Sequence, residues 1–179
     1  MSLPALYIGR FQPFHLGHLD AVKQILSHEN SVIIAIGSAQ YSDTETNPYT
    51  FETRKQIIES SLADAKISPE KFIILPLDDI HDDAQWCNYA DETLPPYGNV
   101  YAASPITKSL YEAQNKHPVV PLNLRLPISS TAIREKIKSN QEWQDLVPAA
   151  CYKSISASSP APSHLSHVRF DDAPDTTAP

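Results

Sequence analysis

The stretch Gly9-Arg10-Phe11-Gln12-Pro13-Phe14-His15-Leu16-Gly17-His18 decides the fold, because it joins two differently patterned segments. Residues 5–8 before it form a short apolar run, which predicts a buried strand. The apolar residues after it have the spacing of one helix face: Leu19, Val22, Ile25 and Leu26. Gly9 permits a tight turn and Pro13 blocks an early helix. A strand, a loop and a helix in this order predict an α/β protein with a parallel sheet.

The two histidines of this segment indicate a phosphate site. His15 and His18 are three residues apart, so on a helical turn both imidazoles project the same way and can donate hydrogen bonds to phosphate oxygens. Gly17 lacks a Cβ, so a ligand can approach the first turn, whose backbone N–H groups and dipole favour anions. Arg10 adds a cation with a planar fork. A lone histidine usually caps a helix, but this combination favours function.

A second segment, Ile128-Ser129-Ser130-Thr131-Ala132-Ile133-Arg134, opens a helical pattern about 110 residues later. Its hydroxyl residues are good N-caps, and their amides would face a ligand at the helix start. Arg134 lies on the first turn, where it can reach the same phosphates, while Ile133 holds the helix to the core. By itself this pattern predicts only a helix cap. Paired with the histidine segment, it predicts that both ends of the fold hold one triphosphate.

The rest of the chain fits one Rossmann-like, doubly wound parallel sheet, with a domain over residues 1–152. Near-continuous apolar runs predict strands at 32–36 and 72–75. Further strands are expected at 99–103 and at 119–122, the latter shortened by Pro121. Helical patterns cover 52–63, 82–93, 106–115 and 130–140. In such folds the ligand lies at the carboxyl ends of the strands.

Expectations for four further positions, Ser38, Gln40, Thr50 and Arg54, follow from this arrangement. Gly37 ends the second strand at the ligand edge, so we expect Ser38 and Gln40 to line the nucleotide site. Thr50 is expected to cap the next helix. Arg54, one turn later, is expected to face solvent or phosphate.

Composition narrows the function. The net charge is −7 and the sequence pI is about 5.4, so no basic stripe argues for nucleic acid. No apolar run approaches 20 residues and no signal peptide pattern is present, so we expect no membrane association and a cytoplasmic enzyme. Cys87 and Cys151 have neither metal nor disulfide spacing. Residues 153–179 are rich in Ser, Ala and Pro, which predicts a disordered tail.

The two segments together resemble the HxGH nucleotidyltransferase superfamily, and within it the chain is similar to the archaeal-type nicotinamide mononucleotide (NMN) adenylyltransferases. The resemblance covers roughly residues 4–152. It rests on residues 9–18, 36–40, 47–50 with Arg54, Trp86 and 128–134. It implies the reaction of ATP with NMN to give NAD⁺ and pyrophosphate, usually with Mg²⁺. Relatives commonly form multimers, so a homo-oligomer is an open expectation.

Residue by residue, the resemblance implies that His15, His18, Arg10 and Arg134 bind the ATP phosphates and stabilise the transition state. The remaining implied ATP contacts are Gly9, Phe11, Gly17, Ser129, Ser130, Thr131 and Ile133. The implied NMN contacts are Ser38, Gln40, Asp79, Asp83 and Trp86. Trp86 would stack on the cationic nicotinamide ring, an attraction worth about 1 kcal/mol. The alternative is that Trp86 is a half-buried core residue of an amphipathic helix.

Two positions depart from the family pattern. Ser130 stands where the family usually has Gly, so its side chain could crowd the phosphates or supply a further hydroxyl. Asp83 stands where an amide residue is common. A carboxylate accepts from the carboxamide NH₂ but cannot donate to its carbonyl. It would also repel a nicotinate carboxylate, so Asp83 bears on the choice between nicotinamide and nicotinate forms.

No Ser–His–Asp or Cys–His set adjoins these segments, so we expect direct in-line attack of the NMN phosphate on the ATP α-phosphorus. The sequence offers no carboxylate cage, and Mg²⁺ is expected to arrive on the triphosphate, without dedicated protein ligands. Two alternatives stay open. One is another transferase of the superfamily that accepts FMN, phosphopantetheine or a cytidylyl substrate. The other is a catalytically weak nucleotide-binding sensor.

Overall fold

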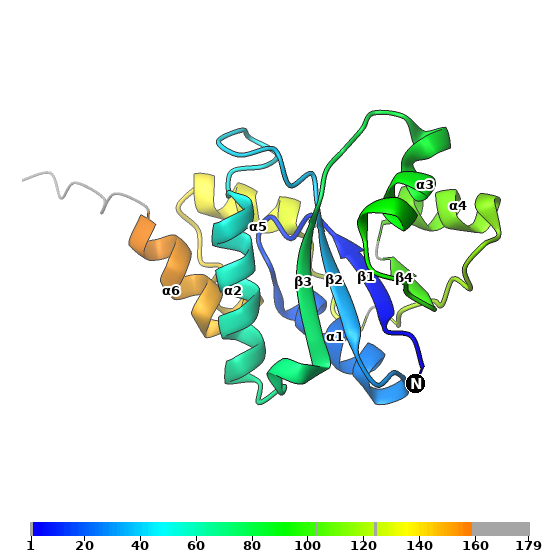
Figure 1. Cartoon of the computed structure of the whole chain (residues 1–179). Helices are drawn as coiled ribbons and strands as arrows, with labels where there is room; N and C mark the ends of the chain where they lie inside the picture. Colours follow the sequence, from blue (N-terminus) through cyan, green and yellow to red (C-terminus); the bar gives the residue numbers. More distant parts are fainter. Residues whose placement is uncertain (1, 103, 124, 159–179) are drawn as a thin grey trace, which may run out of the picture.

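A four-stranded parallel sheet forms the centre of the computed structural model, which describes residues 2–102, 104–123 and 125–158 (Figure 1). The strands are β1 (Ala5–Gly9), β2 (Val32–Gly37), β3 (Phe72–Leu77) and β4 (Val100–Ala102), in the order β3-β2-β1-β4. Every pairing is parallel, and β1 aligns Leu6 with Ile33 on one side and with Val100 on the other. The predicted doubly wound α/β fold is therefore confirmed.

Helices connect and cover these strands. They are α1 (Leu16–His28), α2 (Phe51–Asp64), α3 (Asp83–Thr93), α4 (Pro105–Gln114), α5 (Ser130–Lys138) and α6 (Ala149–Ser158). Short 3₁₀ turns occur at Pro69–Lys71 and Gln144–Leu146. The first five helices begin and end within a few residues of the predicted ranges. Thr50 caps α2 as expected, since its side chain accepts from the Thr53 backbone N–H.

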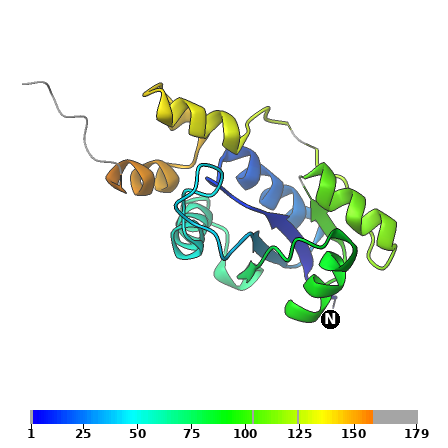
Figure 2. The ribbon, with the colours of Figure 1, turned by 90° about the horizontal axis from the view of Figure 1, so that it is seen from above.

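The sheet is covered on both faces. Alternate strand residues such as Tyr7 and Ile34 pack with α1, α2, α5 and α6 in one apolar core. The intervening residues, such as Leu6 and Ile33, pack with α3 and α4 in a second core. Figure 2 shows α2 and α6 on one side of the sheet and α3 and α4 on the other. Burial on both faces explains why β1 and β2 read as unbroken apolar runs.

The strand expected at 119–122 is wrong. The structure has a single isolated bridge between Val119 and Val100. The Val100 N–H donates to the Pro118 carbonyl (2.8 Å), and the Val120 N–H donates to the Val100 carbonyl (2.9 Å). Pro121 follows directly and has no N–H to continue the ladder.

The boundary expected at residue 153 is also corrected. Helix α6 runs through it to Ser158 and packs along α2 (Figure 1). Cys151 and Ile155 are one helical turn apart and both are buried in the core. Two apolar residues four positions apart are enough to dock a helix that is otherwise rich in Ala and Ser. The remainder of the predicted tail, residues 159–179, lies outside the described residues.

The structure also describes the two cysteines and the hydropathy of the helices. Cys87 and Cys151 are both buried free thiols. Within residues 2–102, 104–123 and 125–158, none of the helices combines the length and hydropathy that a membrane crossing requires.

Candidate active site at the carboxyl edge of the sheet

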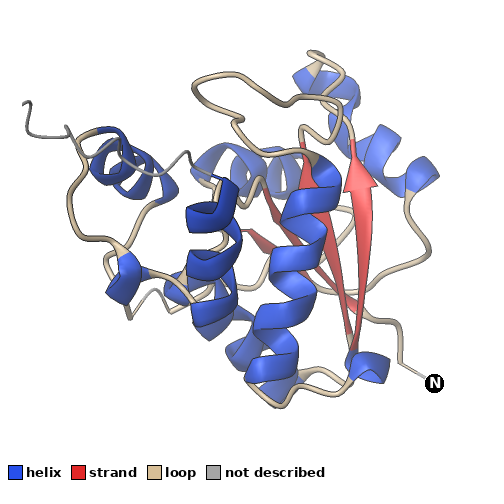
Figure 3. Cartoon of the chain, turned by 90° about the vertical axis from the view of Figure 1, so that its left-hand side faces the viewer, coloured by secondary structure: helices blue, strands red, loops and turns tan. Residues whose placement is uncertain are grey.

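A cavity of about 570 Å³ lies at the carboxyl edge of the strands. Loops that follow the strands lie above this edge (Figure 3). The cavity brings together most of the predicted residues: Gly9, Arg10, Phe11, His15, Gly17, His18, Ser38, Asp79, Asp83, Trp86, Ser129, Ser130, Thr131 and Arg134. Gln40 and Ile133 are not in its wall. Ile133 is fully buried and anchors α5 to the core.

His15 and His18 form a reciprocal cap at the start of α1. His15 is the N-cap, and its Nδ1 accepts from the His18 backbone N–H (3.3 Å). The His15 backbone N–H in turn donates to His18 Nδ1 (3.2 Å). The two rings stack with centroids 3.6 Å apart. Because both Nδ1 atoms are acceptors, we assign the proton of each neutral ring to Nε2. Each imidazole therefore has one N–H donor to offer a ligand.

Burial keeps both rings neutral. It lowers the pKa of His15 to about 4 from the ordinary 6.5. The pKa of His18 is lowered well below 6.5, first by burial and then by the neighbouring His15. At neutral pH the pair therefore acts through hydrogen-bond donation, while the positive charge of the site comes from arginine.

The two glycines of the segment make room for rings. Gly9 was expected to permit a tight turn, but the left-handed residue is Phe11, with φ of 52°. A Cβ on Gly9 would lie 2.8 Å from the Phe11 ring, so the glycine accommodates that ring. Phe11 in turn supports His18 edge-on, with centroids 4.9 Å apart. A Cβ on Gly17 would lie 3.1 Å from the His15 ring, so Gly17 leaves space for the imidazole.

Helix α5 is hydrogen-bonded directly to the loop before α1. Ser129 caps α5, and its side chain accepts from the Ala132 N–H (3.2 Å). The Ser130 hydroxyl donates to the Pro13 carbonyl (3.0 Å), and Arg134 donates to the Gln12 carbonyl (2.8 Å). Ser130, which stands where the family usually has Gly, therefore links the two predicted phosphate segments by a hydrogen bond.

Arg10 and Arg134 supply positive charge to the same cavity. Burial, and then the proximity of Arg10, lowers the pKa of Arg134. Arg134 is held by Gln12 and Thr131, whereas the Arg10 guanidinium has no hydrogen-bond or ion-pair partner among the described residues. Two cations placed close enough to repel each other are typical of a site that binds a polyanion.

Arg54 faces neither solvent nor phosphate, which corrects the expectation for it. Its side chain is 1% exposed and lies under the site. Its guanidinium donates to backbone carbonyl oxygens of Arg10 (3.0 Å), Gly37 (2.9 Å) and Ser38 (3.2 Å). The Nε atom donates to the Thr50 carbonyl (3.2 Å). Burial lowers the pKa of Arg54 to about 10, so it stays charged at neutral pH.

Gln40 reaches the site through Asp79. Its amide donates to the Asp79 carbonyl (2.8 Å) and accepts from the Asp79 N–H (3.1 Å). These two bonds tie the loop after β2 to the loop after β3. Gln40, which was predicted to contact NMN, thus fixes the backbone of Asp79. Asp79 itself lines the cavity.

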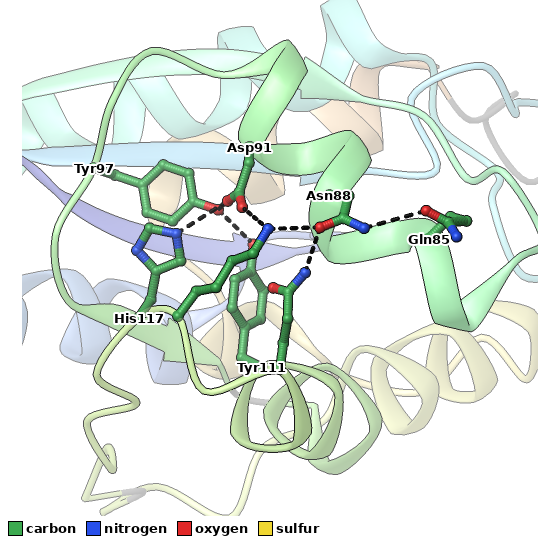
Figure 4. Close-up of polar contacts among 8 residues, drawn as sticks. Gln85, Asn88, Asp91, Tyr97, Tyr111 and His117 are labelled. Atoms are coloured by element: carbon green, nitrogen blue, oxygen red, sulfur yellow. Dashed lines mark hydrogen bonds and ion pairs between the residues drawn. The ribbon is translucent and has the colours of Figure 1, made fainter.

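Trp86 lies on α3 and lines the cavity. Figure 4 shows a polar network that joins α3 to α4 and to the chain beside them. Trp86 packs edge-on against Tyr111, with centroids 6.2 Å apart and planes at 88°. The Tyr111 and Tyr97 hydroxyls are 3.0 Å apart. The Asp91 carboxylate accepts hydrogen bonds from Tyr97, His117 and Lys116. Since these residues come from α3, α4 and the segments beside them, the network fixes the wall that carries Trp86.

Several wall residues were missed by sequence reasoning. They are Tyr7, Ile8, Gln12, Gly37, Ser104, Ile106, Thr107, Leu110, Leu126 and Ile128. Gln12 was within the quoted motif, and its amide also pairs with both backbone groups of Tyr49 (2.9 and 3.0 Å). The start of α4 could have been found from Ser104-Pro105, an N-cap followed by proline at N1. Leu126 had no distinguishing sequence signal.

The described residues contain no group of three or more His, Cys, Asp or Glu side chains that could hold a metal ion. Asp79 and Asp83 are the carboxylates in the wall of the cavity. The absence of dedicated metal ligands stays a prediction.

A doubly wound sheet with paired imidazoles, two arginines and the N-termini of several helices around one cavity defines a nucleotidyltransferase. The chain belongs to the cytidylyltransferase-like family, whose model matches residues 6–136. It is 39% identical over 151 residues to a nicotinamide-nucleotide adenylyltransferase of Saccharolobus solfataricus, covering 84% of this chain and 88% of that one. These matches confirm the resemblance that the motifs indicated.

Solved structures agree with the fold. A crystal structure of a bifunctional NMN adenylyltransferase/ADP ribose pyrophosphatase from Francisella tularensis superposes with a TM-score of 0.74 and 28% identity, over 82% of this chain and 45% of that one. This chain therefore spans less than half of that longer protein. A second structure of such an enzyme from Francisella tularensis, complexed with AMP and a manganese ion, has a TM-score of 0.69 and 28% identity, over 82% of this chain and 44% of that one.

Proposed function

We propose that this protein is an NMN adenylyltransferase, which transfers AMP from ATP to NMN and releases pyrophosphate. The observation that carries the proposal is a single cavity lined by two groups of residues, which we call its phosphate end and its acceptor end. The histidine pair and the α5 N-terminus belong to helices on one face of the sheet, whereas Trp86 and Asp83 belong to α3 on the other face. Asp79, in the loop after β3, lines the same cavity. The identity to nicotinamide-nucleotide adenylyltransferases over most of the chain supports it.

At the phosphate end, the protein contributes positioning and charge compensation. The Nε2–H groups of His15 and His18 donate to phosphate oxygens of ATP, and Arg10 and Arg134 offset their charge. An NMN phosphate oxygen attacks the α-phosphorus in line. A P–O bond to NMN forms, and the bond between the α-phosphorus and the bridging oxygen breaks. Pyrophosphate leaves with the electron pair of that bond. No protein nucleophile is needed.

ATP enters as its Mg²⁺ complex, because the phosphate oxygens and water supply the octahedral oxygen ligands that Mg²⁺ prefers. The manganese ion in the related structure supports a divalent ion in this family. The location in the cytoplasm and the assembly into a homo-oligomer stay predictions.

At the other end, the indole face of Trp86 stacks on the cationic nicotinamide ring. Asp79 and Asp83 lie in the same wall, and Asp83 at the first turn of α3 is exposed to the cavity. A carboxylate there accepts from the carboxamide NH₂ and repels the carboxylate of nicotinate mononucleotide. NMN is therefore the preferred acceptor.

The test is pyrophosphate release by the purified protein with ATP and Mg²⁺, comparing NMN, nicotinate mononucleotide, FMN and phosphopantetheine. Turnover with NMN well above the other three is expected. Turnover with FMN or phosphopantetheine alone would contradict the proposed substrate while keeping the transferase chemistry. ATP binding without turnover on any acceptor would favour a nucleotide-binding sensor.

A further inference from the structure

Arg54 is a buried cation that the chemistry of the site does not explain. Its guanidinium forms no ion pair among the described residues, although the more distant Glu52 attracts it, and its hydrogen bonds go to backbone carbonyls. A buried charge without an ion-pair partner is costly unless its donors are satisfied. Four carbonyl acceptors satisfy it here, and three of them belong to the turns that follow β1 and β2.

Those turns are the ones that present site residues. The Arg10 carbonyl accepts a hydrogen bond from Arg54, while Arg10 itself lines the cavity. The Gly37 and Ser38 carbonyls accept from it at the end of β2. Beside these contacts, Phe11 and Ser38 adopt left-handed φ values of 52° and 50°, which side-chain-bearing residues seldom adopt. Strain of this kind persists only when neighbouring contacts hold it.

Charge gives a second reason for this arrangement. Carbonyl oxygens at the carboxyl ends of parallel strands carry partial negative charge and would repel a triphosphate. Arg54 covers those of residues 10, 37 and 38, and Arg134 and Ser130 cover those of residues 12 and 13. The site then offers amides, imidazoles and Arg10 to the anion.

We propose that Arg54 is a positioning residue of the phosphate site, which holds the turns after β1 and β2 and withdraws their carbonyl oxygens from the bound triphosphate. The inference rests on the proposed function only in taking ATP as the ligand. Lysine cannot replace it, because one ammonium group lacks the planar fork that reaches carbonyls on two strands.

The experiment measures ATP affinity directly, by calorimetric titration without NMN, for the wild type, Arg54→Lys and Arg54→Met. Measurements are made below the melting midpoint of every variant, with folding checked by circular dichroism. Both substitutions are expected to weaken ATP binding about 10- to 100-fold, the size expected for losing hydrogen bonds to a charged group. Arg54→Lys keeps the charge and serves if Arg54→Met does not fold.

Two control variants separate positioning from simple destabilisation. Leu62→Ala removes a fully buried side chain further along the same helix, away from the cavity. It should lower the melting midpoint while ATP affinity stays that of the wild type. Lys55→Met changes the neighbouring half-exposed cation, which pairs only with Glu59 among the described residues, and should alter neither property.

Added guanidinium ion provides the discriminating readout. In Arg54→Ala it should restore ATP affinity, whereas an alkylammonium ion of similar size should not. ATP affinity equal to the wild type in folded Arg54→Lys and Arg54→Met would overturn the inference. So would a loss of affinity in Leu62→Ala that matches theirs. If the wild type binds ATP but transfers no AMP to NMN, the proposed function fails while this test of Arg54 still stands.

Discussion

The two ends of the cavity are built in different ways. At the phosphate end, His15 and His18 cap each other within four residues of sequence, and the loop before them is fastened by α5. At the opposite end, Trp86 depends on Tyr111, Tyr97 and Asp91, which are dispersed over α3, α4 and the chain between them. Under the proposed function, the comparison teaches that the local motif carries the chemistry, while dispersed contacts shape the wall for the acceptor.

The comparison is tested most severely by removing one imidazole. His18→Ala should lower kcat on the order of 10²–10³-fold, with a smaller change in substrate binding, because a donor aimed at developing charge is lost. Steady-state kinetics with ATP and NMN measure it. His28→Ala, at the exposed end of the same helix, is the control and should leave kcat unchanged. Near-normal turnover of His18→Ala would contradict its assigned role.

Acid should weaken the phosphate end. The folded state depresses the pKa of His15 to about 4, while the unfolded chain titrates near 6.5. Below pH 6.5 the unfolded state therefore binds more protons, and the free energy of unfolding falls, by up to about 3 kcal/mol near pH 4. Urea unfolding at several pH values measures it.

The control for this prediction is the double variant His15→Asn/His18→Gln. Asparagine and glutamine at these positions can form a capping box without an ionisable ring. Its stability should change less between pH 6.5 and 4 than that of the wild type. An equally steep fall would assign the effect to other groups.

At the acceptor end, Asp91→Ala should destabilise the protein by about 2 kcal/mol, because the Tyr97 hydroxyl loses its acceptor in a mostly buried place. The KM for NMN should rise with it, since the support of Trp86 is loosened, while ATP affinity stays constant. Thermal unfolding and kinetics report the two effects. Asp64→Ala, at the exposed last residue of α2, is the control. A rise in the KM for ATP instead would mean that the two ends are not independent.

Trp86→Ala should raise the KM for NMN roughly tenfold, which corresponds to the loss of about 1.4 kcal/mol of ring stacking. ATP affinity should not change. The matched control is Trp143→Ala, because Trp143 packs on Tyr152 away from the cavity. If the KM for NMN is unchanged in Trp86→Ala, Trp86 is a core residue and the acceptor lies elsewhere.

The smallest expected effect is on selectivity. Asp83→Asn should reduce the preference for NMN over nicotinate mononucleotide by a few-fold, on the order of 1 kcal/mol, because the repulsion of the nicotinate carboxylate is removed. The ratio of kcat/KM values for the two acceptors measures it. Asp82→Asn, which keeps an N-cap residue of α3, serves as the neighbouring control. An unchanged ratio would place the acceptor ring away from Asp83.

Features that depend on neighbouring residues could be predicted from the sequence, whereas features that depend on contacts between distant segments could not. The four strands and the start of the helix at the histidine segment were predicted, because apolar runs and turn residues act over a few positions. The reciprocal cap of His15 and His18 was not predicted, since histidine is an uncommon N-cap residue. The role of Arg54 was not, since its carbonyl partners lie at residues 10, 37 and 38, and only the folded chain brings them together. The order of the sheet likewise depends on packing between distant segments.

Helix α6 illustrates the limit of composition. The Ser- and Ala-rich sequence from residue 153 predicted a tail, yet Ile155 is buried against the core. Ile155 is the one apolar residue of that helix beyond residue 153 with core burial, so the tail sequence has no periodicity, and the burial of this residue depends on the packing of α6 along α2. For the same reason the bonds between Gln40 and Asp79 could not be foreseen from either residue alone.

The reciprocal cap of His15 and His18 has a consequence for how the site comes into being. The two rings place their protons on Nε2 only while both Nδ1 atoms accept from the first turn of α1. Nucleating that turn fixes several dihedral angles for little return in hydrogen bonds, so it is the least favourable step in forming a helix. The same step sets the tautomers. Under the proposed mechanism, the fraction of molecules ready to react is therefore the fraction in which this first turn is formed, and fraying at His15 and His18 would act as reversible inactivation.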